Sequence, residues 1–264
     1  MISFTAVQLN TLVAAYLWPM TRILGVMALA PLYNNGDIPA PIKIGLSFLL
    51  ALIVAPAVPA VAAADPMSMT GLLILAQQMV IGLGLGLVMR MAFAAAEMAG
   101  TITGLTMGLG FATFFDPQSE GQSSAISQFF ALLMIMIYLA ANLHLVVLST
   151  LVDSFQTMPI STHAFEGNSL QLLAAWGGRI FSSGLQLSLP LVAALLITNL
   201  ALGILTRAAP QLNLFGIGFP VTMSVGFVMI ALTLPYMTTP LLSLMEEAIN
   251  VMQKITTANL PPLR

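Results

Sequence analysis

Long apolar stretches separated by short polar or proline-containing segments dominate this chain. A helix needs about 20 apolar residues to cross a bilayer, and six stretches approach or exceed that length. They are residues 7–30, 42–58, 66–110, 124–152, 179–207 and 215–237. The third follows Asp65 and Pro66, a helix cap with proline at the first helical position, and is too long for one simple span. The pattern therefore predicts a bundle of apolar helices.

The segments between these stretches predict how the helices are joined. Residues 153–169 are polar and predict a loop, whereas residues 208–213 suit the tight turn of a helical hairpin. Beyond Pro240, from Leu241 to Ile255, apolar residues recur at helical spacing, which predicts a separate amphipathic helix that does not span. Its polar face carries Glu246, Glu247, Asn250 and Lys254.

Composition excludes an ordinary water-soluble domain. Hydrophobic residues make up 59% of the chain and charged residues 6%, whereas a typical soluble domain carries about 25% charged residues. The net charge is −2 and no run of Lys or Arg occurs, so nucleic-acid binding is not supported. Cysteine is absent, which excludes disulfides and thiolate metal sites. We predict an all-α integral membrane bundle without a sheet, in which lipid or other apolar protein is the solvent.

Small residues recur at every fourth position in the long third stretch. The series is Ala92, Ala96, Gly100, Gly104, Gly108 and Ala112. On a helix these residues form one smooth ridge, which lets another backbone approach closely where lipid supplies no hydrophobic drive. Tight packing within one bundle explains such a ridge by itself. The alternative interpretation is that the ridge belongs to a movable segment, and the residues that follow it are relevant to that alternative.

Those residues combine glycines, aromatic side chains and a proline. They include Gly108, Gly110, Phe111, Phe114, Phe115, Asp116 and Pro117. Glycines permit a hinge, and a proline prevents the helix from continuing. The three phenylalanines between hinge and stop predict one of two things: a buried helix-to-loop cap, or a short aromatic plug that occludes a cavity by excluding water.

Four ionisable residues interrupt otherwise apolar stretches. They are Arg22, Arg90, Glu97 and Arg207. Such residues normally face the bundle interior, a water path or a subunit contact, so we expect structural pairing. Arg90 and Glu97 lie two turns apart on one helical face, but a proton relay is disfavoured because arginine does not release its proton.

The chain offers no catalytic constellation. Asp116 and Asp153 both lie beside loop signals, so they do not resemble the facing aspartates of an intramembrane protease. His144 and His163 lack a metal-ligand partner four residues on, and the glycines at 82, 84 and 86 lie within a helix rather than after a strand. We predict a non-enzymatic protein without a metal or cofactor.

Several strings resemble the FliR family of flagellar biosynthetic proteins, also called the SctT family. They are Trp18-Pro19 with Arg22, Gln77-Gln78 with Gly82, residues 107–117, residues 199–203, and Arg207 through Asn213. The likeness runs in order along essentially the whole chain. It implies one R-type subunit, over residues 1–264, of the type III secretion export gate of the bacterial flagellum, in the cytoplasmic membrane and flagellar basal body.

The resemblance also implies partners and a division of the chain. P-type and Q-type subunits would join this one in a helical, closed-ended pore, with larger B-type and A-type components nearby, and unfolded flagellar proteins would pass through. Residues 1–175 would form a P-like part with a plug over 108–122, and residues 176–264 a Q-like hairpin. In that family some helices face neighbouring subunits above the membrane, and Gln211 and Asn213 join the polar contacts at the hairpin turn.

Three alternatives stay open. The equivalent subunit of a virulence injectisome would have nearly the same fold. A secondary transporter would place a substrate site near broken helices, such as those around Pro19 or Pro190, but we see no repeat that pairs these breaks. The third alternative is a purely structural scaffold.

Overall fold

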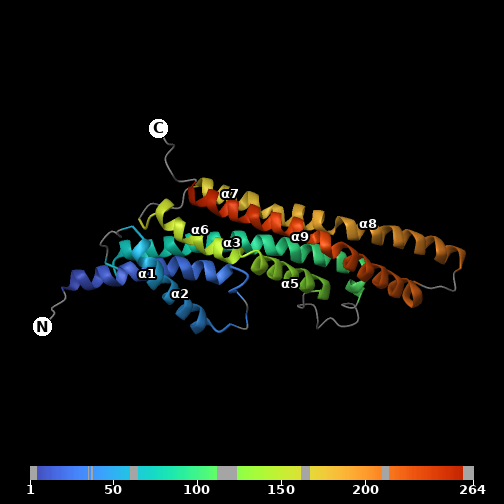
Figure 1. The fold of residues 1–264 in the computed structure, drawn as a ribbon, viewed down its shortest axis with the longest axis horizontal. Helices are drawn as coiled ribbons and strands as arrows, with labels where there is room; N and C mark the ends of the chain where they lie inside the picture. Colours follow the sequence, from blue (N-terminus) through green and yellow to red (C-terminus); the bar gives the residue numbers. More distant parts are fainter. Residues whose placement is uncertain are drawn as a thin grey trace. The chain divides into compact units, whose positions relative to one another are not determined.

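The computed structural model describes residues 5–34, 36, 38–59, 65–111, 124–161, 167–209 and 214–257, and it is helical throughout (Figure 1). The α-helices are α1 (Ala6–Leu29), α2 (Ala40–Val54), α3 (Met69–Thr106), α5 (Ala125–Ala140), α6 (Leu143–Thr157), α7 (Gly167–Gly177), α8 (Arg179–Ala208) and α9 (Phe219–Thr257). Short 3₁₀ turns η1 (Ala55–Ala57) and η2 (Leu109–Phe111) and the π-helical turn η4 (Leu214–Gly218) accompany them. These residues contain no strand, so the predicted all-α class is confirmed.

Five helices in the described residues are long and apolar enough to cross a membrane, or six if α5 and α6 form one broken span. The third is a single helix of 38 residues, which confirms that this stretch exceeds one simple span. At about 1.5 Å per residue it is far longer than the roughly 30 Å hydrocarbon layer. We conclude that the predicted membrane helical bundle is correct.

Three boundaries differ from the sequence prediction. The stretch 124–152 was predicted as one helix, but the chain breaks at Asn142, whose φ of 56° is left-handed. Asparagine enters the left-handed region more readily than most residues, so it can break a helix without any change in the hydrophobic pattern of the sequence. The predicted loop 153–169 is partly wrong, because α6 continues to Thr157 and α7 begins at Gly167.

The helix predicted after Pro240 is also not separate. Helix α9 runs unbroken through Pro235 and Pro240. The amphipathic pattern itself is confirmed, since Leu241, Leu244, Met245, Ala248, Met252 and Ile255 are buried. Their polar counterparts, Glu246, Glu247, Asn250 and Lys254, are exposed. Prolines are tolerated inside apolar helices where neighbouring groups satisfy the freed backbone, which explains why they did not end this one.

The cap at the start of α3 also differs from the sequence prediction. Asp65 and Pro66 were predicted to cap it, but the Asp65 side chain instead accepts a hydrogen bond from the Met67 amide at 2.9 Å, in a turn. The hydroxyl of Ser68 accepts from the Gly71 amide at 3.0 Å and takes the capping role. The aspartate favoured a local turn over a helix cap.

The chain divides into two compact units. Unit 1 contains Met1–Met91, Asn142–Gly177 and Met245–Arg264. Within it α2 packs on α1, the Trp176 indole donates to the Val88 carbonyl of α3 at 3.1 Å, and the Ser169 hydroxyl donates to the Ile255 carbonyl of α9 at 3.3 Å. These contacts tie distant parts of the sequence into one core.

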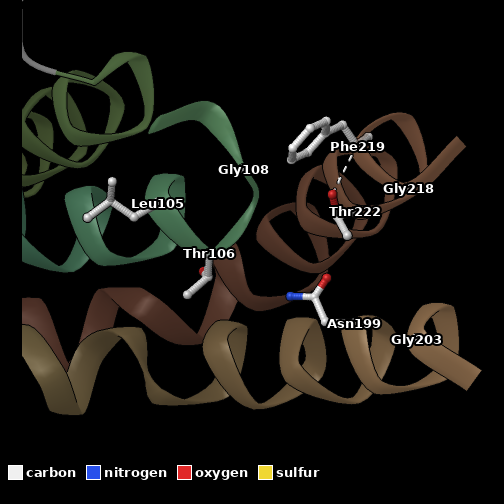
Figure 2. Close-up of a pocket in the computed structure, with 8 residues that line it drawn as sticks. All are labelled: Leu105, Thr106, Gly108, Asn199, Gly203, Gly218, Phe219 and Thr222. Carbon is white, nitrogen blue, oxygen red and sulfur yellow. Dashed lines mark hydrogen bonds between the residues drawn. The ribbon is translucent and has the colours of Figure 1, made fainter. Parts of the chain in front are cut away.

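Unit 2 contains Ala92–Ala141 and Gly178–Leu244. Here Phe93 of α3 meets Tyr138 of α5 edge to face, with ring centroids 5.9 Å apart. Helix α8 packs against η4, and the two helices that flank residues 208–213 lie side by side, as a helical hairpin requires (Figures 1 and 2). The division into P-like and Q-like parts concerns relationships to other proteins and stays a prediction.

Candidate functional site

The end of α3 lies where the predicted hinge begins. The Gly108 amide donates to the Leu105 carbonyl at 3.0 Å, and Gly108 then takes a φ of 90° before the chain enters η2. A side chain makes that conformation strained, so glycine is the residue that suits this helix end. The chain therefore leaves the α-helix within two residues of Thr106, immediately before the phenylalanine-rich stretch.

Helix α9 holds this helix end at three points. The Thr222 hydroxyl lies 3.1 Å from the Met107 carbonyl and 3.0 Å from the Phe219 carbonyl of its own helix, so its single proton is shared between these two acceptors. The Phe219 ring occupies the space of a missing side chain, because a Cβ added to Gly108 would lie 2.6 Å from the ring. One turn further, the Met107 side chain covers Gly226, where an added Cβ would lie 2.6 Å from its Cγ. Positions 219, 222 and 226 share one helical face, so α9 presents a continuous surface to the end of α3.

A pocket of about 420 Å³ adjoins these contacts. It is lined by Leu105, Thr106, Gly108, Asn199, Gly203, Gly218, Phe219 and Thr222. Figure 2 shows the Asn199 amide projecting from α8 toward the space between Thr106 and Thr222. None of these lining side chains is ionisable. The pocket therefore offers hydrogen-bonding groups within mostly apolar walls, and no acid or base.

Several predicted gate residues fall outside the described part of the chain. They are Phe114, Phe115, Asp116 and Pro117, together with Ala112 of the ridge. Phe111 ends η2, and Gly110 lies close enough to α3 that an added Cβ would meet a Leu105 methyl at 2.8 Å. The aromatic plug thus stays a prediction, while its starting point is fixed by Gly108.

A second polar site surrounds Arg22, inside unit 1. This side chain is fully buried. Its Nε donates to Gln78 Oε1 at 2.8 Å, and its Nη1 donates to the Ser154 carbonyl at 2.8 Å and hydroxyl at 3.0 Å. Its Nη2 donates to the Met158 carbonyl at 2.8 Å, and the guanidinium lies 4.3 Å from the centre of the Phe155 ring.

These bonds join α1, α3 and the end of α6 through one side chain. Each acceptor is a neutral oxygen, so the charge is stabilised by hydrogen bonds and by the aromatic face. A buried charge is costly unless its donors are satisfied, and here the geometry satisfies at least four of them. The arrangement acts as a structural tie rather than as a reactive group.

The partners of Arg22 were not identified from the sequence. Gln78 belongs to the Gln77-Gln78 pair quoted for the family resemblance, which was the one available signal. Ser154 and Met158 fell in the stretch predicted as a loop, so that boundary error concealed them. Phe219 and Thr222 were missed because nothing in their local sequence relates them to Gly108.

The small-residue ridge packs on the start of α5. A Cβ added to Gly100 would lie 2.6 Å from Ser127 Cα, and one added to Gly104 would lie 2.6 Å from Ser124 Oγ. The Ser127 hydroxyl also donates to the Glu97 carbonyl at 2.9 Å. Ala92 and Ala96 are buried. Close packing therefore accounts for the ridge from Ala92 to Gly104, whereas Gly108, which was predicted on the same helical face, lies beyond the end of α3 with a left-handed φ of 90°.

The other charged candidates occupy different surroundings. Arg90 and Glu97 are half-buried on α3, and Arg207 is exposed in the last turn of α8. Gln211 and Asn213 lie outside the described residues. Contacts of these five with other subunits stay predictions.

Comparison with known proteins connects this geometry to a family. Residues 13–248 match the family of bacterial export proteins, family 1. Flagellar biosynthetic protein FliR of Pectobacterium carotovorum subsp. carotovorum is 43% identical over 89% of this chain and 90% of its own length. The chain belongs to the FliR family of bacterial export proteins. FliR of Escherichia coli K12 is 38% identical over 97% of both chains, and FliR of Bacillus subtilis 168 is 32% identical over 82% of this chain and 84% of its own.

The FliR family and the apolar helices together define the setting of this chain. It is a membrane-embedded component of the flagellar export apparatus. The resemblance that the sequence strings carried is thereby confirmed, since the match covers those strings from Trp18 to Asn213. The Gly108 helix end and the Arg22 tie are features of such a component.

Proposed function

We infer that this FliR-family chain is the R-type subunit of the flagellar type III export gate. It forms part of the pore through which unfolded flagellar proteins pass, in the cytoplasmic membrane at the flagellar basal body. The observation that carries this proposal is the end of α3, where left-handed Gly108 stands directly before the stretch that holds Phe111, Phe114 and Phe115. An aromatic segment that starts where the α-helix ends at a fixed left-handed glycine suits a plug that excludes water.

Sister subunits complete the structure in this proposal. Helix α8 and the part of α9 before Pro240 leave many large apolar side chains exposed, namely Phe181, Leu185, Leu189, Leu196, Ile197, Leu200, Ile204, Phe227, Val228, Leu232 and Tyr236. Helices of 30 and 39 residues also exceed the roughly 30 Å hydrocarbon layer. P-type and Q-type subunits would cover part of this apolar surface, and lipid would cover the rest. B-type and A-type components would lie next to this assembly.

The gate itself is non-enzymatic in this proposal, and the energy for export comes from elsewhere. The pocket beside the helix end has no ionisable lining residue, and the buried Arg22 is fully engaged in holding helices together. A passage with a plug needs packing and exclusion of water, which apolar helices and phenylalanines supply. The flagellar assignment is preferred over an injectisome because the similar proteins are named as flagellar.

Deleting residues 110–115 tests the plug. We expect the membrane to become permeable to ions and small solutes, because the aromatic segment would no longer exclude water from the closed passage. The measurement is solute leakage in cells that contain equal amounts of assembled gate.

A matched pair of variants sharpens this test. Replacing Phe111, Phe114 and Phe115 together by leucine keeps apolar bulk and should keep the passage closed, whereas replacing the same three by serine should open it. Unchanged permeability in both the deletion and the serine variant would rule out the plug.

A further inference from the structure

The contacts between α9 and the end of α3 have the properties of a latch. They include a Thr222 hydroxyl bond that is shared with the Phe219 carbonyl, one ring against Gly108, and one methionine side chain over Gly226. None involves a charge, and two of the three depend on a glycine that leaves room for its neighbour. Such contacts hold a backbone in one position while leaving it able to separate.

The adjoining pocket provides free volume into which the Phe219 ring can move. Protein interiors are packed so densely that a ring moves only where free volume exists. Phe219 lines the pocket of about 420 Å³, so its ring has such volume beside its present position. After release the Thr222 hydroxyl keeps a second acceptor, the Phe219 carbonyl of its own helix at 3.0 Å, which is the bond drawn in Figure 2. Two alternative sets of contacts are what a two-state element requires.

The segment before Phe219 has an irregular helical conformation. It is the π-helical turn Leu214–Gly218, which packs against α8. Single π-helical turns are found frequently at functional sites. Because this turn comes directly before Phe219, a change of its register would rotate Phe219 and Thr222 together relative to Gly108.

We propose that Phe219 and Thr222 are positioning residues that latch the end of α3 to α9 and hold the gate closed. Movement of the Phe219 ring into the neighbouring pocket releases the latch. This proposal rests on the proposed function, because it assumes that the segment starting at Gly108 obstructs the passage.

The first experiment removes the hydroxyl of Thr222 and restores it. Thr222→Val keeps the side-chain shape without the donor, and Thr222→Ser keeps the donor. We expect the valine variant to leak about two to ten times more than the parent, as loss of one net hydrogen bond allows, and the serine variant to stay tight. Ser224→Ala is the matched control, because that hydroxyl donates to the Pro220 carbonyl of its own helix at 2.7 Å.

The second experiment locks the latch. The chain has no cysteine, so the double variant Met107→Cys and Gly226→Cys introduces the only two thiols. The Met107 Cγ lies 2.6 Å from the Cβ position of Gly226, so the two Cβ atoms are at most about 4 Å apart, and a disulfide needs a separation of about 3.5–4.5 Å. Oxidation should stop flagellar secretion and reduction should restore it, whereas each single-cysteine variant should secrete equally under oxidising and reducing conditions.

The outcomes separate the latch from the proposed function. If deletion of residues 110–115 causes leakage but Thr222→Val does not, the latch is wrong and the plug stands. Leakage from neither variant overturns the plug and the latch together. Equal leakage from the serine and valine variants, secretion through the oxidised pair, or failure of the pair to oxidise would each overturn the latch alone.

Discussion

Replacing Arg22 by methionine is expected to prevent accumulation of the folded protein. The change removes the donor from the Gln78 amide oxygen and the Met158 carbonyl, whereas the Ser154 carbonyl keeps the Met158 amide and the Ser154 hydroxyl keeps the Leu151 carbonyl. Each buried polar group left unsatisfied costs about 1–3 kcal/mol, so the two together, with the lost contact to Phe155, reach the lower end of the roughly 5–15 kcal/mol that separates many folded proteins from their unfolded state. The amount of protein in membranes, and its thermal stability in mild detergent, measure the effect.

Two further variants identify the cause. Arg22→Lys keeps the charge but offers a compact ammonium in place of a planar fork stacked on Phe155, so we expect partial loss. Arg207→Met removes an exposed charge and should leave the stability of the chain unchanged, whatever it does to contacts with other subunits. Normal accumulation of Arg22→Met would show that the buried network contributes little.

Replacing Gly82 by valine is the second change with a large expected effect. A Cβ at this position would collide with the backbone carbonyl of Arg22 on α1, and with the Gly25 Cα at 3.0 Å. Overpacking usually costs about 1–3 kcal/mol, and a clash with backbone falls at or above the upper end because no side chain can yield. Displacing α1 would also pull Arg22 away from Gln78 and Ser154. Thermal stability in mild detergent should therefore fall sharply.

Gly45→Ala is the matched control for that experiment. It lies in the middle of α2, and an added Cβ would meet nothing within 4 Å. Alanine favours a helix over glycine by about 0.5–1 kcal/mol, so stability should hold or rise slightly. Equal losses from the valine and alanine variants would mean that close approach of α1 and α3 is not what Gly82 provides.

The helices could largely be predicted from the sequence, because an apolar run of bilayer length is a signal averaged over many residues. Helix α1 was predicted over 7–30 and α8 over 179–207, and both fall within a few residues of their observed bounds. The failures came from single residues. Asn142 breaks a helix by adopting a left-handed conformation, and Pro235 and Pro240 do not break one.

The site was predictable only where its signal is local. The glycines indicated a hinge and Pro117 the last possible end of the helix, but the helix ends earlier than that limit, at Thr106, with Gly108 already left-handed. The residue that holds this end, Thr222, lies 115 positions away from Met107, and Arg22 reaches partners 56 to 136 positions away. Contacts at such separations depend on how helices pack, which hydrophobic periodicity does not specify.

The mass of the particle purified in mild detergent tests most directly whether this chain completes its structure with sister subunits. We expect a hetero-oligomer several times heavier than the 27.9 kDa chain, with α8 and α9 protected from labelling reagents that reach them in the isolated subunit. A lone, stable chain of monomer mass that carries no other subunit would contradict the account.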